Sequence, residues 1–333
     1  MIDDGLDGKE PAFPEEEGGP PRRLDFYGED TAPLNRELRS QMARHFRLAG
    51  LSPAWYAPRP LNDEPYRQFR ETRQAEDMPC LVAAANPRHY TRPAFARRWF
   101  DGGTYAPLPA LETRPEFVRA GLNDPRDVFR VYGGTCWVIL VDMERLGNRP
   151  PPKGWADLFD PRYRQDIMVN GQEDKPAPML LANLGRDFGT ARLERLGHNL
   201  KAVRLPSEMA RAAGSRDPNR AAINVLPWFW AENNIHKDNA VVVWPEEGAY
   251  CTPMLMFGKP HLTPGAAAAF DFLTGASWAE RMESICCPVA GSRHAHPPLP
   301  GELRWIGWDM LRSPDLDALI FEAGQRCRKG YCQ

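Results

Sequence analysis

Two apolar runs, about a hundred residues apart, constrain the fold of this chain more than any other feature. The first covers residues 127–147 (DVFRVYGGTCWVILVDMERLG) and is broken by a glycine pair that begins at Gly133. The second covers residues 241–259 (VVVWPEEGAYCTPMLMFGK), bends at Pro245 and resumes near Tyr250. Apolar runs bounded by proline and glycine are typical of strands. Two such strands can each carry the chain between lobes, so the sequence predicts two lobes separated by a cleft.

Strands and helices alternate along the chain in the order expected of an α/β fold. Short strands are predicted at residues 23–27 and 80–85, and helices at residues 34–48 and 92–100. This rhythm is typical of a sheet that is covered by helices on both faces. A chain of 333 residues is also too long for one ordinary core, and it fits two lobes of roughly 100 to 200 residues.

We expect the chain to divide into a tail and two lobes. Residues 1–22 form an acidic, disordered tail, residues 23–133 and 252–333 the first lobe with the C-terminal helices, and residues 134–251 the second lobe. The tail lacks the basic and apolar regions of a secretory signal. A cytoplasmic protein is therefore expected, or a periplasmic one if a leader has been removed.

Composition excludes several classes of partner. A formal net charge of -2 provides no general field to attract nucleic acid or an anionic membrane surface. No apolar stretch reaches the roughly 18 residues that insertion into a membrane requires. The seven cysteines are odd in number and scattered, which predicts reduced thiols and no disulfide framework. We expect a monomer.

Three segments resemble a known family. Residues 154–169 (GWADLFDPRYRQDIMV) resemble the start of the second lobe in iron(III)-type ABC transporter substrate-binding proteins, which have the periplasmic-binding-protein-like type II fold. The motifs WPEEG (residues 244–248) and WIGWD (residues 305–309) resemble a signal-less, cytoplasmic branch of that superfamily. The resemblance implies a Venus-flytrap fold with two crossover strands and one small ligand in the cleft. It also implies an acceptor protein or an ABC permease as partner.

The chain departs from this family at its iron site. Ferric-ion members commonly present an adjacent tyrosine pair from the second lobe, since phenolate oxygens suit a trivalent cation. The corresponding residues 223–233 (INVLPWFWAEN) offer Trp228, Phe229 and Trp230, and none of these coordinates iron. We expect Trp228 and Trp230 to lie on one side of an extended segment and to form a stacking wall. The alternative is that both belong to the core of the lobe.

The remaining candidate ligand-binding residues lie at strand ends or on the crossover strands, where such folds bind ligands. They are Tyr27 and Gly28 in the turn of residues 27–31, Asn86, Asn170 and Gln172 after other strands, and Gly134, Thr135, Cys136 and Tyr250 on the crossovers. The glycine pair can instead mark a bulge or a turn that needs a positive φ angle. Asn86 can instead serve only as a turn former.

Metal sites and catalytic motifs are weakly indicated. Cys286, Cys287, His294 and His296 lie within eleven residues, either as metal ligands or within a proline-rich loop. Two further cysteines near the C-terminus indicate a redox tail or a frayed end; they are Cys327 and Cys332. The signatures GxSxG, GxxxxGK[ST], HExxH and GxGxxG do not occur. A binding protein is therefore expected, and no enzyme.

These observations leave three functional hypotheses. The first is a cytoplasmic carrier that holds a metal complex, a metal-containing cofactor or an anion. The second is an exported receptor of an ABC transporter whose leader is absent from this chain. The third is an enzyme on the same scaffold, with Cys136 as the nucleophile.

Overall fold

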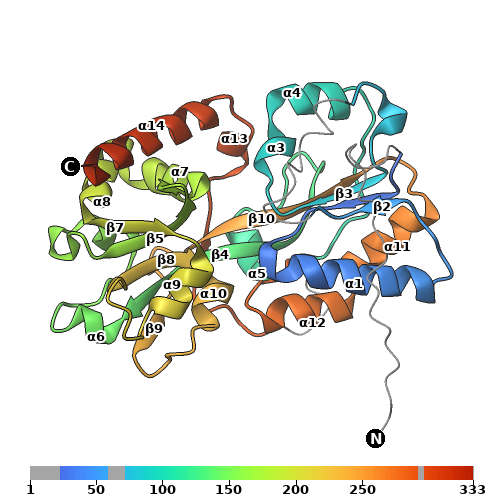
Figure 1. The fold of residues 1–333 in the computed structure, drawn as a ribbon. Coiled ribbons are helices and arrows are strands. Elements are labelled where there is room, and N and C mark those ends of the chain that lie inside the picture. Colours follow the sequence, from blue (N-terminus) through green and yellow to red (C-terminus); the bar gives the residue numbers. More distant parts are fainter. Residues whose placement is uncertain (1–22, 59–71, 292–295, 333) are drawn as a thin grey trace, which may run out of the picture.

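The structure is a computed structural model that describes residues 23–58, 72–291 and 296–332. The expected tail of residues 1–22 and the candidate ligand His294 lie outside these ranges. Figure 1 shows two lobes that share one continuous sheet. In the described part of the chain this sheet has eleven strands, of which eight follow the order β2-β1-β3-β10-β4-β8-β5-β6.

The first lobe has parallel strands with helices on both faces. Its strands are β1 (Phe26–Gly28), β2 (Trp55–Tyr56) and β3 (Leu81–Ala84). Its helices are α1 (Ala32–Leu48), α3 (Arg88–Thr91), α4 (Pro93–Phe95), the π-helix Ala96–Phe100, α5 (Pro115–Arg119), α11 (Pro264–Leu273) and α12 (Ala276–Ser284). Helices α1, α11 and α12 lie on one side of the sheet and α3 and α4 on the other (Figure 1). The two strands and two helices expected in this part of the chain are confirmed.

Helix α1 shows how the sequence specifies these layers. Leu34, Leu38, Met42 and Phe46 recur every four residues, and all four are buried on the face that packs toward the sheet and α11. Pro33 stands in its first turn, where a missing N–H costs no hydrogen bond. The helix therefore starts at a fixed point immediately after the loop that follows β1.

The second lobe repeats this plan with a second set of strands. They are β5 (Ile167–Gln172), β6 (Lys175–Pro176), β7 (Leu200–Arg204), β8 (Ile223–Pro227) and β9 (Ala240–Val243). Its α-helices are α6 (Met143–Leu146), α7 (Pro178–Phe188), α8 (Leu193–Asn199), α9 (Pro206–Ala212) and α10 (Trp228–Glu232). Short 3-10 helices cover Trp155–Phe159, Pro161–Tyr163 and Thr190–Arg192 in this lobe, and Ala75–Asp77 in the first.

Two long antiparallel strands carry the chain between the lobes, as the sequence predicts. They are β4 (Arg130–Asp142) and β10 (Ala249–Gly258), and they pair Gly133 with Met254 and Trp137 with Tyr250. The register shifts between Met254 and Leu255, so Tyr132 is an extra residue that makes a bulge in β4. Both passages expected near Gly133 and Tyr250 therefore lie side by side at the hinge.

The glycine pair in β4 is needed for close packing of protein groups. Neither glycine has a positive φ angle. A Cβ atom on Gly133 would come within 2.6 Å of the Met282 methyl, and one on Gly134 within 2.4 Å of the Cys251 sulfur. The backbone N–H of Gly134 donates to the Pro288 carbonyl at 2.9 Å. The expected bulge is present, while the positive φ angle is not.

The C-terminal segment makes a third passage between the lobes. Strand β11 (Leu303–Arg304) pairs with β10, the short helix α13 (Trp308–Leu311) follows, and α14 (Asp315–Tyr331) packs on α7 and α8 of the second lobe. We expected all of residues 252–333 in the first lobe, and the structure divides them instead. The physical reason is that buried Leu316, Ala323 and Cys327 complete the apolar cores around α7 and α8.

The motif WIGWD fastens this third passage to the first lobe. The indole N–H groups of Trp305 and Trp308 donate to the carbonyls of Ala120 and Leu122, at 2.9 and 3.1 Å. Next to them, Arg312 lies 4.6 Å from the Trp308 ring centre and donates to both oxygens of Asp124 at 2.7 Å. The segment is thus held by aromatic packing and by one buried ion pair.

Replacing Arg312 by alanine should lower the free energy of unfolding by about 3 kcal/mol, because it leaves a buried carboxylate without its cation. The Asp124 side chain is 0% exposed and that of Arg312 is 12% exposed. Urea unfolding followed by circular dichroism measures the change. As a control, Arg326→Ala breaks the exposed pair with Glu322 and should cost less than about 1 kcal/mol. Equal losses in the two variants would contradict the assignment.

Candidate functional site

The loop Glu29–Thr31 lies where the first lobe meets the second. It follows β1, and its backbone is fixed because the Glu29 N–H donates to the Ala83 carbonyl at 2.8 Å and the Ala85 N–H donates to the Glu29 carbonyl at 3.1 Å. Thr31 then caps α1 through its carbonyl, which accepts from the Asn35 N–H at 2.9 Å. This loop is the turn that the sequence marked as a candidate.

Three buried polar atoms, two in this loop and one on β4, lack a hydrogen-bond partner among the described residues. Asp30 is 6% exposed; its Oδ1 accepts from the Thr31 N–H at 2.7 Å, but its Oδ2 has no partner among the described residues. The Thr31 hydroxyl makes no cap hydrogen bond and, like the hydroxyl of Thr135 on β4, finds no partner in the described ranges. A buried polar group without a hydrogen bond costs about 1 to 3 kcal/mol. A bound solute could offset this cost.

The two carboxyl groups of the loop have pKa values well above those of ordinary carboxylic acids. Burial raises the pKa of Asp30 to about 7, although the hydrogen bond from the Thr31 N–H opposes the change. Burial also raises the pKa of Glu29 to about 7, although the Tyr90 hydroxyl, 3.4 Å from its Oε2, opposes the change. Near neutral pH, both groups exchange readily between the acid and the carboxylate.

Two further titratable groups lie close to the loop. Burial raises the pKa values of Tyr132 and Cys287 well above their usual range, and the charge of Asp30 raises both further. Tyr132 is the bulged residue of β4, and Thr135 follows it by three positions on the same strand. The bulge thus brings the hinge strand to the acidic loop. We refer to Glu29–Thr31, Tyr132, Thr135 and Cys287, together with α10, as the interlobe junction.

Helix α10 forms the wall of the junction on the side of the second lobe. Phe229 is buried in the same apolar cluster as Tyr132 and Cys287, and the partly buried Trp230 packs against that cluster. Trp228 packs edge-to-face on Trp244, with ring centres 5.2 Å apart. The expectation of an extended segment at Trp228 and Trp230 is wrong. Pro227 ends β8 and a helix begins at once, so Trp228 and Trp230 point in different directions.

Five of the expected ligand-binding residues have their side chains or Cα atoms in the core. Tyr27, Gly28, Gly134, Cys136 and Tyr250 are buried. Tyr250 stacks on Trp155 with ring centres 4.6 Å apart, and its hydroxyl donates to Asp187 at 2.8 Å. Cys136 faces Cys251 across the hinge strands. These residues contribute to the core and not to an open binding surface.

Three further expected residues lie at strand ends and are at least partly accessible. Asn86 is exposed, and its Oδ1 accepts from the Arg88 N–H at 3.3 Å, as a turn former does. Asn170 is partly buried and Gln172 exposed, at the end of β5. Sequence reasoning included the turn of residues 27–31 but did not single out its two carboxyl groups. Adjacent acidic residues directly after a buried strand were the available signal.

No group of three or more metal-binding side chains occurs in the part of the chain that the structure describes. Burial raises the pKa of Cys286 to about 11, which disfavours the thiolate that binds metals. His296 lies 2.6 Å from the Gly291 carbonyl and 3.5 Å from Glu283. Near the C-terminus, Cys327 is buried on α14 and Cys332 is exposed.

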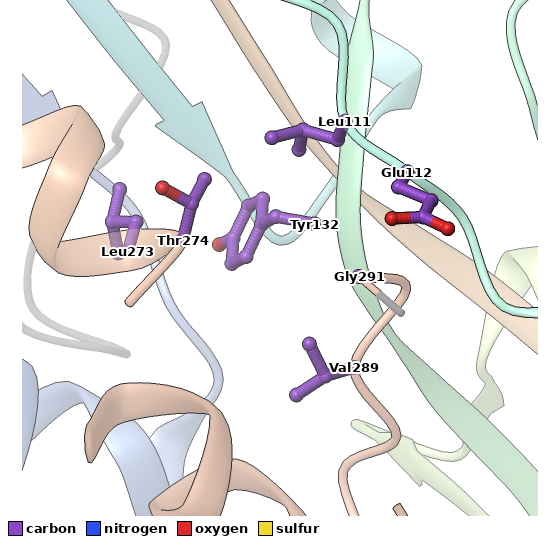
Figure 2. A pocket seen from close by; sticks show the side chains of 7 residues that line it. All are labelled: Leu111, Glu112, Tyr132, Leu273, Thr274, Val289 and Gly291. Carbon is purple, nitrogen blue, oxygen red and sulfur yellow. The ribbon is translucent and has the colours of Figure 1, made fainter. Parts of the chain in front are cut away.

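A separate small pocket lies within the first lobe. Figure 2 shows Tyr132 between the end of α11 and the segment after α12, with Leu111 and Glu112 on a third segment nearby. The lining residues are mostly apolar: Leu111, Glu112, Tyr132, Leu273, Thr274, Val289 and Gly291. Since Tyr132 belongs to both, the pocket adjoins the interlobe junction through one side chain.

Comparisons with known proteins agree with this architecture. The sequence profile of a family described as bacterial extracellular solute-binding protein matches residues 77–314. The apo ferric ion-binding protein A of Pasteurella haemolytica is similar in structure, with a TM-score of 0.68 and 12% identity over 92% of this chain and 99% of that chain. A search of curated proteins found no match.

Two further solved structures share the fold. The Trichodesmium protein IdiA (FutA), in complex with iron and citrate, has a TM-score of 0.64 and 10% identity over 90% of this chain and 98% of that chain. The periplasmic binding protein AfuA from Actinobacillus pleuropneumoniae, with fructose-6-phosphate bound, has a TM-score of 0.62 and 13% identity over 92% and 98%. The expected two-lobed α/β fold is confirmed. No helix among the described residues is long and apolar enough to cross a membrane.

Protein stability should fall as the pH rises from about 4 to about 7. In this window the folded state keeps the protons of Glu29 and Asp30, with pKa values of about 7, whereas the unfolded state releases them near 4. The Asp30→Asn variant keeps the acceptor for the Thr31 N–H. Its free energy of unfolding should fall by about 2 to 4 kcal/mol less than that of the wild type over this pH range. Thermal unfolding between pH 4 and 8 measures it. An Asp101→Asn control, at an exposed carboxyl, should match the wild type, and an unchanged profile for Asp30→Asn would refute the assignment.

Proposed function

The chain belongs to the family of bacterial extracellular solute-binding proteins, and we propose that it binds one small solute at the interlobe junction. The observation that carries this proposal is the set of buried oxygens without partners: Asp30 Oδ2, Thr31 Oγ1 and Thr135 Oγ1. Two of them belong to the loop after β1, and the third belongs to a crossover strand. A solute that contacts all three would bridge the first lobe and the hinge.

Closure of the lobes would complete the site. Hinge bending in two-lobed proteins is absorbed by a few residues of the connecting strands. Here β4 and β10 are paired through the hinge, and α14 of the second lobe is held to the first lobe by ion pairs of Arg88 and Arg92 with Asp317. Surface ion pairs contribute little to stability, so a solute could outweigh them.

An enzymatic role for Cys136 finds no support in its surroundings. The thiol is buried and hydrogen-bonded to that of Cys251, and both effects raise its pKa well above the usual range. A nucleophilic cysteine needs the opposite, a lowered pKa and an adjacent base. A binding function remains the better proposal.

We propose a cytoplasmic carrier as the first form of this function, and an exported ABC-transporter receptor as the second. All seven cysteines are free, including Cys136 and Cys251 on opposed strands, which suits a reducing compartment. Family membership supports the receptor instead. Fractionation of cells that express the native gene should recover the protein in the cytoplasm with all thiols free, and recovery in the periplasm would replace the carrier by the receptor.

Full-length protein purified from its native cells without oxygen should carry one small solute per chain in native mass spectrometry. The Thr135→Val variant keeps the shape of the side chain and removes its hydroxyl, so it should retain at least fivefold less solute. The control Thr190→Val removes a hydroxyl bonded to Glu322 on the surface and should retain as much as the wild type. Solute-free wild-type protein, or full retention by Thr135→Val, would contradict the proposal.

A further inference from the structure

We infer that the solute is a small organic cation whose ammonium group lies against Asp30. This inference rests on the proposed function, because it names the chemical class that the interlobe junction would bind. The carboxylate of Asp30 can only accept hydrogen bonds, and its Oδ2 is the buried oxygen that lacks a partner among the described residues. An ammonium group supplies up to three donors and no acceptor, so it complements this oxygen.

The neighbouring polar atoms fit the same ligand. Thr31, the next residue in the chain, contributes a hydroxyl oxygen that can accept from an ammonium group, and Glu29 adds a second carboxyl group next to Asp30. Helix α1 would otherwise attract an anion at its N-terminus. Asp30 already occupies that position, because its Oδ1 accepts from the Thr31 N–H at 2.7 Å. An anionic solute would therefore meet a carboxyl group where it needs a donor.

The charges on the facing elements favour a cation as well. The charges of Glu232 and Lys237 in the second lobe and of Glu283 in α12 act on the pKa of the nearby Cys286. Lys237 is 3.7 Å from Glu232, so that its charge is offset. Glu283 is likewise paired with Arg114 at 2.9 Å, so Glu29 and Asp30 are the carboxyl groups of the junction whose charge no ion pair among the described residues offsets.

Helix α10 adds an aromatic surface to this acidic surrounding. Trp230 is partly buried and packs against the apolar cluster that contains Tyr132 and Cys287. The charge of Asp30 raises the pKa values of these two residues. An indole face attracts a desolvated cation. Trp230 therefore suits an organic cation, and no group of three or more metal-binding side chains occurs in the described ranges.

The test is isothermal titration of the full chain with two kinds of probe. Putrescine and ethanolamine represent ammonium ligands, and citrate and inorganic phosphate represent anions. We expect at least one ammonium probe to bind, and Asp30→Asn to weaken it at least tenfold. Asp101→Asn, at an exposed carboxyl of the same lobe, should leave binding unchanged, and thermal unfolding of both variants confirms that they are folded.

The pH dependence of the titration separates an ionic contact from a merely structural role of Asp30. Binding of the ammonium probe should weaken up to tenfold per pH unit below about 7, as the carboxylate takes up its proton. The groups that face Asp30 are Glu29 from its own loop, Tyr132 from β4 and Cys287 from the segment after α12. Only Glu29 titrates in the same range, so Asp30→Asn should flatten most of the profile and Glu29→Gln the remainder.

The outcomes distinguish this inference from the proposed function. Binding of citrate or phosphate without binding of either amine would overturn the cation class and leave a solute-binding protein. A failure of all four probes would also overturn it, while native mass spectrometry decides independently whether a solute is carried. Amine binding that is equal in Asp30→Asn and in the wild type would remove Asp30 from the site.

Discussion

The structure depends on the antiparallel pairing of β4 with β10. All thirteen residues of β4 are buried, and the strand belongs to the first lobe at Arg130 and to the second at Asp142. Because the bulge at Tyr132 fixes its register against β10, it also fixes where Thr135 lies relative to the loop Glu29–Thr31. The geometry of the candidate site is therefore set by strand pairing, and the surface loops only complete it.

Much of this arrangement could be predicted from the sequence. A β-branched run interrupted by Gly133 and Gly134 is a local signal, and its partner run around Tyr250 carries a matching one. The third passage could not be predicted in the same way. Residues such as Leu316 and Ala323 show only helical spacing, and nothing local tells which lobe buries them. Their placement is decided by the apolar faces of α7 and α8 that α14 covers, and these faces form only when the second lobe has folded.

The candidate site was predicted in position but not in chemistry. Aromatic residues at Trp228 and Trp230 attract attention in a sequence, whereas Glu29 and Asp30 look like an ordinary solvated turn. Their meaning comes from burial, which raises both pKa values to about 7 and leaves one carboxylate oxygen without a partner in the described structure. This burial depends on segments that are distant in the chain, such as β4 and the segment after α12, and the sequence around Asp30 carries no trace of them.

The position of α14 has a consequence for anyone who wishes to study one half of this molecule alone. A fragment cut at the two crossovers, residues 134–251, would lack the helix that packs on α7 and α8, and it would expose the faces of these helices around Gly185 and Gly197 to solvent. Such a fragment would be prone to aggregate. An independently folding half must join residues 134–251 to α14 by a designed linker that replaces the intervening first-lobe segment.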